Sequence, residues 1–167
     1  ARHAALDGDP EQAHHYFLRA VNANPNSPVV HSQLGMFYSG QGSHEAAAAH
    51  FFLAGLLWDD NDVYQKQLSS TLQQLGHRRA ALRCLMRAAE LNPADETLPV
   101  RIEQLQASLP AGDAVGPESG LSVTRHDSGF PSTVGQTTAR LDGSVVLDGV
   151  WTEWHASGSL KAVACDR

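Results

Sequence analysis

Residues 10–23, PEQAHHYFLRAVNA, contain an apolar triplet that recurs along the chain. Ala13, Phe17 and Ala20 lie on one stripe of a helix, with the i, i+4, i+7 spacing of a core-facing surface. The triplet returns twice at a constant interval of 34 residues (47 − 13 and 81 − 47), first as Ala47, Phe51 and Ala54 and then as Ala81, Leu85 and Ala88. A recurrence of this length is typical of stacked helix pairs, each of which buries its apolar face against the next.

Turn-forming residues between the apolar stripes predict where the helices begin and end. Asp9 suits an N-cap, Pro10 suits the first position of a helix, and Asn24 with Pro25 ends that helix. Similar signals predict helices over residues 10–23, 28–39, 44–57, 62–75, 77–91 and 95–108. Small residues at the repeated alanine sites allow helices to approach closely, so we expect these positions to form core rather than a ligand site.

The pattern resembles the tetratricopeptide repeat (TPR) family. The matching residues of the middle repeat are Leu34, Gly35, Tyr38, Ala47, Phe51 and Ala54. Those of the third repeat are Leu68, Ala81, Leu85, Ala88 and Pro93, whereas Ser69 and Leu72 depart from the glycine and the aromatic residue that are usual. The resemblance covers residues 1–109 and implies a mainly α fold, a TPR-like superhelix with a partial first repeat, two full repeats and a capping helix.

The last third of the chain has a different composition. Residues 110–120, PAGDAVGPESG, are predicted to be a linker, and residues 121–167 are rich in Gly, Ser, Thr and Val. Asp-Gly at 142–143 and 148–149 and Ser-Gly at 157–158 are typical of hairpin turns. Alternating side chains predict a half-buried strand over 150–155, and a short strand is expected over 160–164.

Residues 149–161, GVWTEWHASGSLK, resemble a MORN-like repeat of the antitoxin and envelope variant. The matching residues are Gly149, Trp151, Glu153, Trp154, Gly158, Leu160 and Lys161. Residues 125–129 echo residues 154–158 at an offset of 29, as a degenerate copy. The resemblance implies β-hairpins, and the family strings several of them together, so a truncated array is one interpretation of residues 121–167.

Composition and motifs exclude several classes of function. A net charge of −6 with only two lysines disfavours nucleic acid as a partner, because phosphates need clustered cations. No apolar stretch approaches the roughly 20 residues of a membrane span, so we expect no membrane insertion. The nine histidines lack metal-ligand spacing, and no nucleophile or nucleotide-binding motif occurs. We therefore expect no enzyme activity, no metal and no cofactor.

The TPR resemblance implies a concave groove lined by the first helix of each pair, where a non-catalytic scaffold or adaptor would bind a protein or peptide segment. By that analogy the groove residues are Arg2, Gln33, Met36, Lys66, Gln67, Ser70, Gln73, Arg101 and Gln104. The basic and asparagine clamp that some members use for a terminal carboxylate is not reproduced. Glutamines with two cations suit hydrogen bonding to a peptide backbone, although the same residues also suit a solvated helix surface.

Two other functions remain open from the sequence. In the first, the repeats self-assemble into a homo-oligomer, because an incomplete first repeat would leave Phe17 and its neighbours uncovered. In the second, the chain is a regulatory part of a longer polypeptide whose catalytic domain lies elsewhere.

Overall fold

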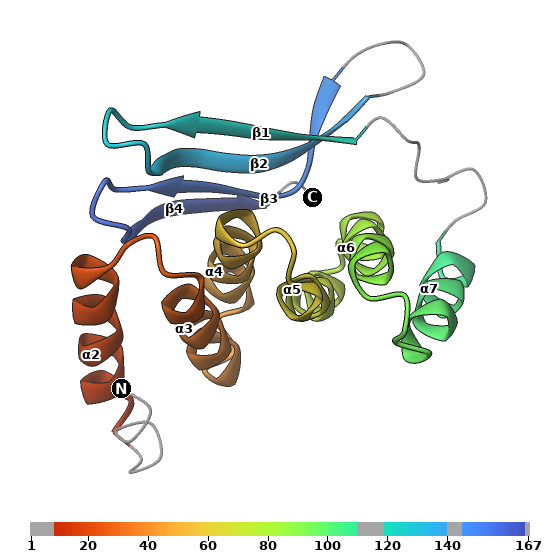
Figure 1. Cartoon of the computed structure of the whole chain (residues 1–167), viewed down its shortest axis with the longest axis horizontal. Coiled ribbons are helices and arrows are strands. Elements are labelled where there is room, and N and C mark those ends of the chain that lie inside the picture. Colours follow the sequence, from red (N-terminus) through yellow and green to blue (C-terminus); the bar gives the residue numbers. More distant parts are fainter. Residues whose placement is uncertain (1–8, 110–118, 140–144, 166–167) are drawn as a thin grey trace.

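The structure is a computed structural model that describes residues 9–109, 119–139 and 145–165. Within these residues six helices stand side by side in sequence order, and each packs against the next (Figure 1). They are α2 (Pro10–Ala23), α3 (Pro28–Gly40), α4 (His44–Leu57), α5 (Asp62–Gln74), α6 (Arg78–Leu91) and α7 (Thr97–Ala107). The predicted stack of helices is therefore confirmed, with ends that differ from the prediction by at most two residues. None of these helices combines the length and the apolar character that crossing a membrane requires.

The 34-residue period of the sequence is also the period of the backbone. Helices α3 and α5 begin at residues 28 and 62, and α4 and α6 begin at residues 44 and 78. The hydrogen bond that ends α2, α4 and α6 recurs as well. In each helix the backbone N–H of the C-cap residue donates to the carbonyl of the third residue of the triplet. The pairs are Asn24 to Ala20, Trp58 to Ala54 and Asn92 to Ala88. Each copy of the triplet therefore both packs a helix and ends it.

The repeated triplet lies in the core. Its second and third copies are buried, and so are Ala13 and Phe17 in the first copy, while Ala20 is half-buried. Packing explains why residue 35 is a glycine, because a Cβ at that position would come within 2.8 Å of the Phe51 ring. The expectation that Phe17 is uncovered is wrong: Phe17 is only 4% exposed, since the ring of Phe37 packs against it at 5.6 Å.

Four antiparallel strands follow the helices and pair in sequence order, β1-β2-β3-β4. They are β1 (Ser119–Arg125), β2 (Pro131–Ala139), β3 (Val145–Trp154) and β4 (Leu160–Cys165). The predicted linker is too long at its end, because residues 119 and 120 already pair with β2. The predicted turn at residues 148–149 is wrong, since β3 continues through it and its register with β2 shifts there. Asp148 and Gly149 thus form an irregularity within a strand. The predicted turn at 142–143 lies outside the described residues.

The two hairpins of the sheet have the same turn. In the β1–β2 turn the His126 N–H donates to Phe130 O, and in the β3–β4 turn the His155 N–H donates to Ser159 O. Gly129 and Gly158 take the same left-handed conformation, with φ of 83° and 82°. The predicted turn at 157–158 is confirmed, and the echo between residues 125–129 and 154–158 corresponds to a repeated backbone turn.

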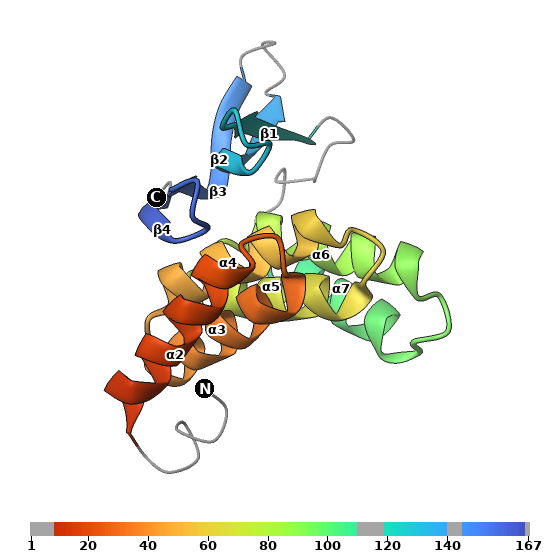
Figure 2. The same ribbon diagram turned by 60° about the vertical axis from the view of Figure 1, so that its left-hand side comes forward.

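The sheet lies across one side of the helical row, where β3 and β4 contact α4 (Figures 1 and 2). Phe130 from the β1–β2 turn, together with Val134 and Trp154 from the sheet, joins the buried cluster formed by the helices. At the edge of this contact, Gly158 sits so close to the loop after α2 that a Cβ would come within 2.5 Å of the Pro25 side chain. The turn glycine therefore serves the docking of the sheet as well as the turn.

We expect Gly158→Ala to lower the free energy of unfolding by about 1–3 kcal/mol more than Gly129→Ala, because only the first adds a steric clash to the shared backbone strain. Gly129 is a matched control, since nothing lies within 4 Å of a Cβ placed there. Urea denaturation followed by circular dichroism measures the difference. Equal losses in the two variants would show that the contact with Pro25 does not constrain the sheet.

Candidate functional site

A hollow of about 460 Å³ opens between α5, α6 and α7. Its polar lining consists of Ser70, Gln73, Arg78, Arg101, Gln104 and Ser108, and two leucines complete it. The leucines, Leu85 and Leu105, are buried, whereas the polar side chains reach the surface. The hollow therefore has an apolar base and a polar rim, which suits contact with another chain.

Four of the residues predicted from the sequence meet at this hollow. Ser70 and Gln73 come from α5, and Arg101 and Gln104 come from α7. Sequence reasoning missed Arg78, because this residue begins the second helix of a pair rather than the groove-lining first helix. Arg78 follows the turn at Gly76 by two residues, and this short spacing is the signal that could have placed Arg78 near the end of α5.

Internal hydrogen bonds hold part of the rim in place. The Gln73 Nε2 amide donates weakly to Ser69, at 3.4 Å to the backbone oxygen and 3.3 Å to Oγ. The Ser108 hydroxyl donates to the Leu105 carbonyl at 2.7 Å. The described lining of the hollow offers hydrogen-bond donors and acceptors together with positive charge.

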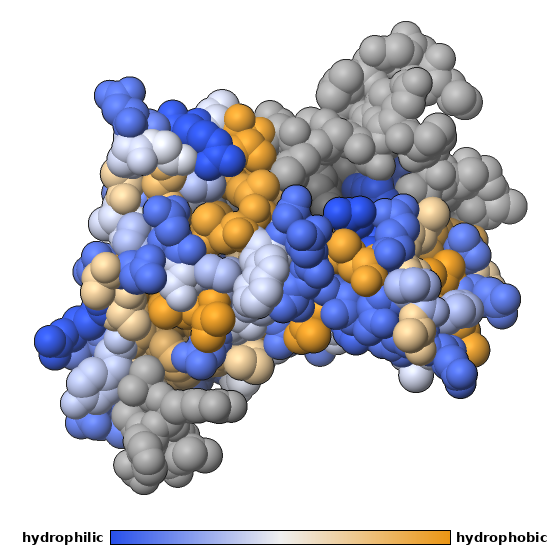
Figure 3. Space-filling view, in the orientation of Figure 1, coloured by the Kyte–Doolittle hydropathy of each residue, from blue (hydrophilic) through white to orange (hydrophobic). Residues whose placement is uncertain are grey.

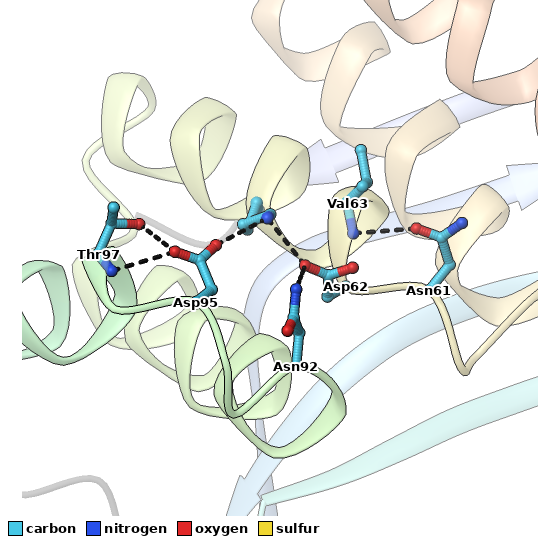
Figure 4. A network of polar contacts seen from close by, with 7 residues as sticks. Asn61, Asp62, Val63, Asn92, Asp95 and Thr97 are labelled. Carbon is cyan, nitrogen blue, oxygen red and sulfur yellow. Dashed lines mark hydrogen bonds and ion pairs between the residues drawn. The ribbon is translucent and has the colours of Figure 1, made fainter.

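Lys66 forms ion pairs with carboxylates of its own chain. Its Nζ lies 2.8 Å from Asp62 and 3.0 Å from Asp95, so it joins α5 to the segment before α7. Figure 4 shows the surrounding network, in which Asn92 donates to Asp62 and Thr97 donates to Asp95. The bond to Asp62, followed by that to Asp95, raises the pKa of Lys66. The bonds from Thr97, followed by that from Lys66, lower the pKa of Asp95 to about 2. The charge of Lys66 is therefore balanced by its own chain.

The remaining predicted groove residues lie apart from the hollow. Gln67 accepts a hydrogen bond from the Ser32 hydroxyl at 3.0 Å, which links α5 to α3. Gln33 is half-buried on α3, and Met36 on the same helix is 45% exposed. Arg2 lies outside the described residues. The structure thus groups Ser70, Gln73, Arg101 and Gln104 but separates them from the α3 residues.

A buried histidine pair joins the helices to the sheet. The Nδ1 atoms of His31 and His50 are 3.1 Å apart, and His31 Nε2 lies 2.8 Å from the Pro25 carbonyl. Because a carbonyl only accepts, His31 carries its proton on Nε2, and the neutral pair then requires His50 Nδ1–H to donate to His31. Burial lowers the pKa of His31 to about 4, and burial together with the neighbouring histidines lowers the pKa of His50. Both rings face Trp154, with centroids 5.6 and 5.1 Å away.

A smaller cavity of about 270 Å³ lies beside this pair, between α2, α3, α4 and the β3–β4 turn. His14, Tyr38 and His50 are its ring-bearing polar residues, and the His14 Nε2 and Tyr38 hydroxyl are 2.8 Å apart. Among the described residues no three His, Cys, Asp or Glu side chains are grouped as a metal ion would need. Apolar side chains, among them Leu18, Val21 and Leu34, complete its lining, so this cavity of mixed polarity lies at the joint between the helices and the sheet.

Comparison with known proteins agrees with the helical architecture. Residues 67–95, from α5 to the loop after α6, match the family model described as tetratricopeptide repeat. The chain is similar to the crystal structure of MamA, with a TM-score of 0.58 at 21% identity over 63% of this chain and 61% of that one. It is also similar to the first TPR of Spaghetti (RPAP3) bound to the HSP90 peptide SRMEEVD, with a TM-score of 0.57 at 16% identity over 64% of this chain and 84% of that one.

The helices α2–α7 therefore have the tetratricopeptide repeat fold, followed by a small antiparallel sheet. Comparison with curated proteins gave no match. The MORN-like repeat remains a prediction, based on residues 149–161 and the degenerate copy at residues 125–129.

Proposed function

We propose that the protein is a non-catalytic scaffold that binds a segment of another protein along α3, α5 and α7. The observation that carries the proposal is the hollow between α5, α6 and α7, where four residues predicted from the repeat pattern meet. The sheet contacts α4 instead, and none of the sheet residues whose side chains are described lines the hollow. A solved structure with the same fold, the first TPR of Spaghetti, is bound to a peptide, which supports this mode of binding.

The surface suits a segment bound mainly through polar contacts. On the face in Figure 3 the hydrophobic spots over the helices are separated by hydrophilic residues. Serine and glutamine side chains in the hollow can donate and accept hydrogen bonds to an extended or helical backbone. We expect an affinity on the order of 1 μM for a short peptide, or about 8 kcal/mol of binding free energy.

Site-specific photo-crosslinking tests this function. A p-benzoylphenylalanine introduced at Gln104, in the hollow, is expected to crosslink one linear segment of a partner in extract of the source cells. The same group at Arg87, an exposed residue that pairs with Glu90, is the control. A synthetic peptide of the crosslinked segment is then titrated calorimetrically against the wild type and against Gln73→Ala/Gln104→Ala. Equal crosslinking from both positions, or binding that the double variant leaves unchanged, would overturn the proposal.

Of the two alternatives, self-assembly has lost its supporting observation, because Phe17 is covered within the chain. A regulatory role within a longer polypeptide stays a prediction, which the intact reading frame would test.

A further inference from the structure

The hollow between α5, α6 and α7 concentrates positive charge in a chain that is acidic overall. Two guanidinium groups, those of Arg78 and Arg101, line it, and none of its described lining residues is acidic. The whole chain carries a net charge of −6. Since like charges placed together in a hollow repel each other, this arrangement favours an anionic group from outside.

The two arginines also differ from Lys66 and Arg87 of the helical stack. Lys66 is balanced by Asp62 and Asp95, and Arg87 pairs with Glu90 at 3.0 Å. Within the part of the chain that the structure describes, neither the Arg78 nor the Arg101 guanidinium has an ion-pair or hydrogen-bond partner. Their ten N–H donors are therefore available to a ligand, since each guanidinium carries five.

We propose that this hollow binds the side-chain carboxylate of a glutamate or aspartate, so that the partner segment is acidic. The inference rests on the proposed function and specifies its partner. A guanidinium binds a carboxylate through two parallel N–H···O bonds, which fixes orientation as well as charge. Ser70 and Gln104, on opposite sides of the hollow, add a hydroxyl and an amide donor for the backbone next to the acidic residue.

Peptide selection on the full chain tests the proposal. The probe is a phage library of random 12-residue peptides fused to the coat protein through their C-termini, so that no terminal carboxylate is available. We expect selection on the wild type to enrich Asp or Glu at a fixed position. Replacing that residue by its amide in a synthetic peptide is expected to weaken binding about tenfold or more, as for loss of a charge-assisted hydrogen bond.

A charge-matched pair of variants locates the effect. Arg78→Gln/Arg101→Gln is expected to abolish the enrichment of acidic residues and to weaken the selected peptide about tenfold or more, in line with the same bond energies. Arg19→Gln/Arg87→Gln removes the same two charges from exposed positions outside the hollow, and it is expected to leave binding unchanged.

The outcomes separate this inference from the proposed function. Selected peptides that are not acidic, but that bind the Gln73→Ala/Gln104→Ala variant more weakly than the wild type, would overturn the inference and leave the scaffold function standing. Equal weakening by both arginine pairs would also overturn it, because the effect would then come from net charge alone. A library that yields no binding peptide would overturn both.

Discussion

Trp154→Ala is expected to lower the free energy of unfolding by about 3–5 kcal/mol, the range for removing a large buried aromatic side chain. Trp154 is 2% exposed and lies at the joint between sheet and helices, with His31 and His50 against its ring. Its Nε1–H donates to the Thr152 hydroxyl at 2.8 Å, so the alanine variant also leaves a buried polar group without its donor.

Urea denaturation at neutral pH, followed by circular dichroism, measures the effect of Trp154→Ala. Trp58→Ala is the control, because Trp58 is 49% exposed and touches Tyr64 only at a ring edge, so we expect a loss below about 1 kcal/mol. Equal losses in the two variants would mean that the sheet does not depend on this contact with the helices.

Acid is expected to destabilise the protein before its carboxylates are protonated. His31 has a pKa of about 4 in the folded protein against 6.5 when unfolded, so below pH 6.5 the unfolded chain binds more protons. Stability is therefore complete above pH 6.5 and falls as the pH drops towards 4, by about 3 kcal/mol for His31 alone. The lowered pKa of His50 adds a loss of the same sign.

The groups around the pair set the direction of this pH effect. From α2, His14 faces His50 and disfavours its charged form, and from α3 the Tyr38 ring stacks on His50. Phe130 from the β1–β2 turn and Trp154 from β3 contribute uncharged rings. Within the described residues no carboxylate contributes to the pKa of either histidine.

The pH effect is measured as the free energy of unfolding in urea at pH 7, 6, 5 and 4.5. His31→Gln/His50→Gln is expected to flatten the slope, whatever its stability at pH 7. Asp62 and Asp95 lose their stabilising charge only at lower pH, because their folded pKa values lie below 3.8. A wild-type stability that is constant between pH 7 and 4.5 would contradict a buried neutral pair.

Local signals were enough to predict the helices. Pro28 marks the start of one helix, and Gly42 and Gly76 follow the ends of two others. These start and stop signals depend on nearby residues only, and they recur with the 34-residue period, so tertiary packing did not override them. The same positional logic selected Arg101 and Gln104, which line the hollow between α5, α6 and α7. These residues could be placed because the repeat fixes which face of each helix they occupy.

Long-range pairing accounts for what the sequence did not predict. Asp148 and Gly149 looked like a hairpin turn, but their place within β3 depends on the register with β2. The partnership of Lys66 with Asp95 spans two helices, so Lys66 looked like a free groove cation. The contact between His31 and His50 has no sequence spacing of its own, because it arises where α3 and α4 cross beneath Trp154.

The sheet docks on α4, so we expect the two halves of the helical stack to differ in stiffness. At the N-terminal end, α2, α3 and α4 are held together by a second layer, through Pro25, His31 and Trp154. At the other end, the main contacts of α5, α6 and α7 among the described residues are with their sequential neighbours, as in a one-dimensional array. Because the sheet makes its main described contacts with α4, we expect bending of the helical row to concentrate around the arginine-lined hollow. A bound segment would adjust the curvature there while the sheet-bound half keeps its shape.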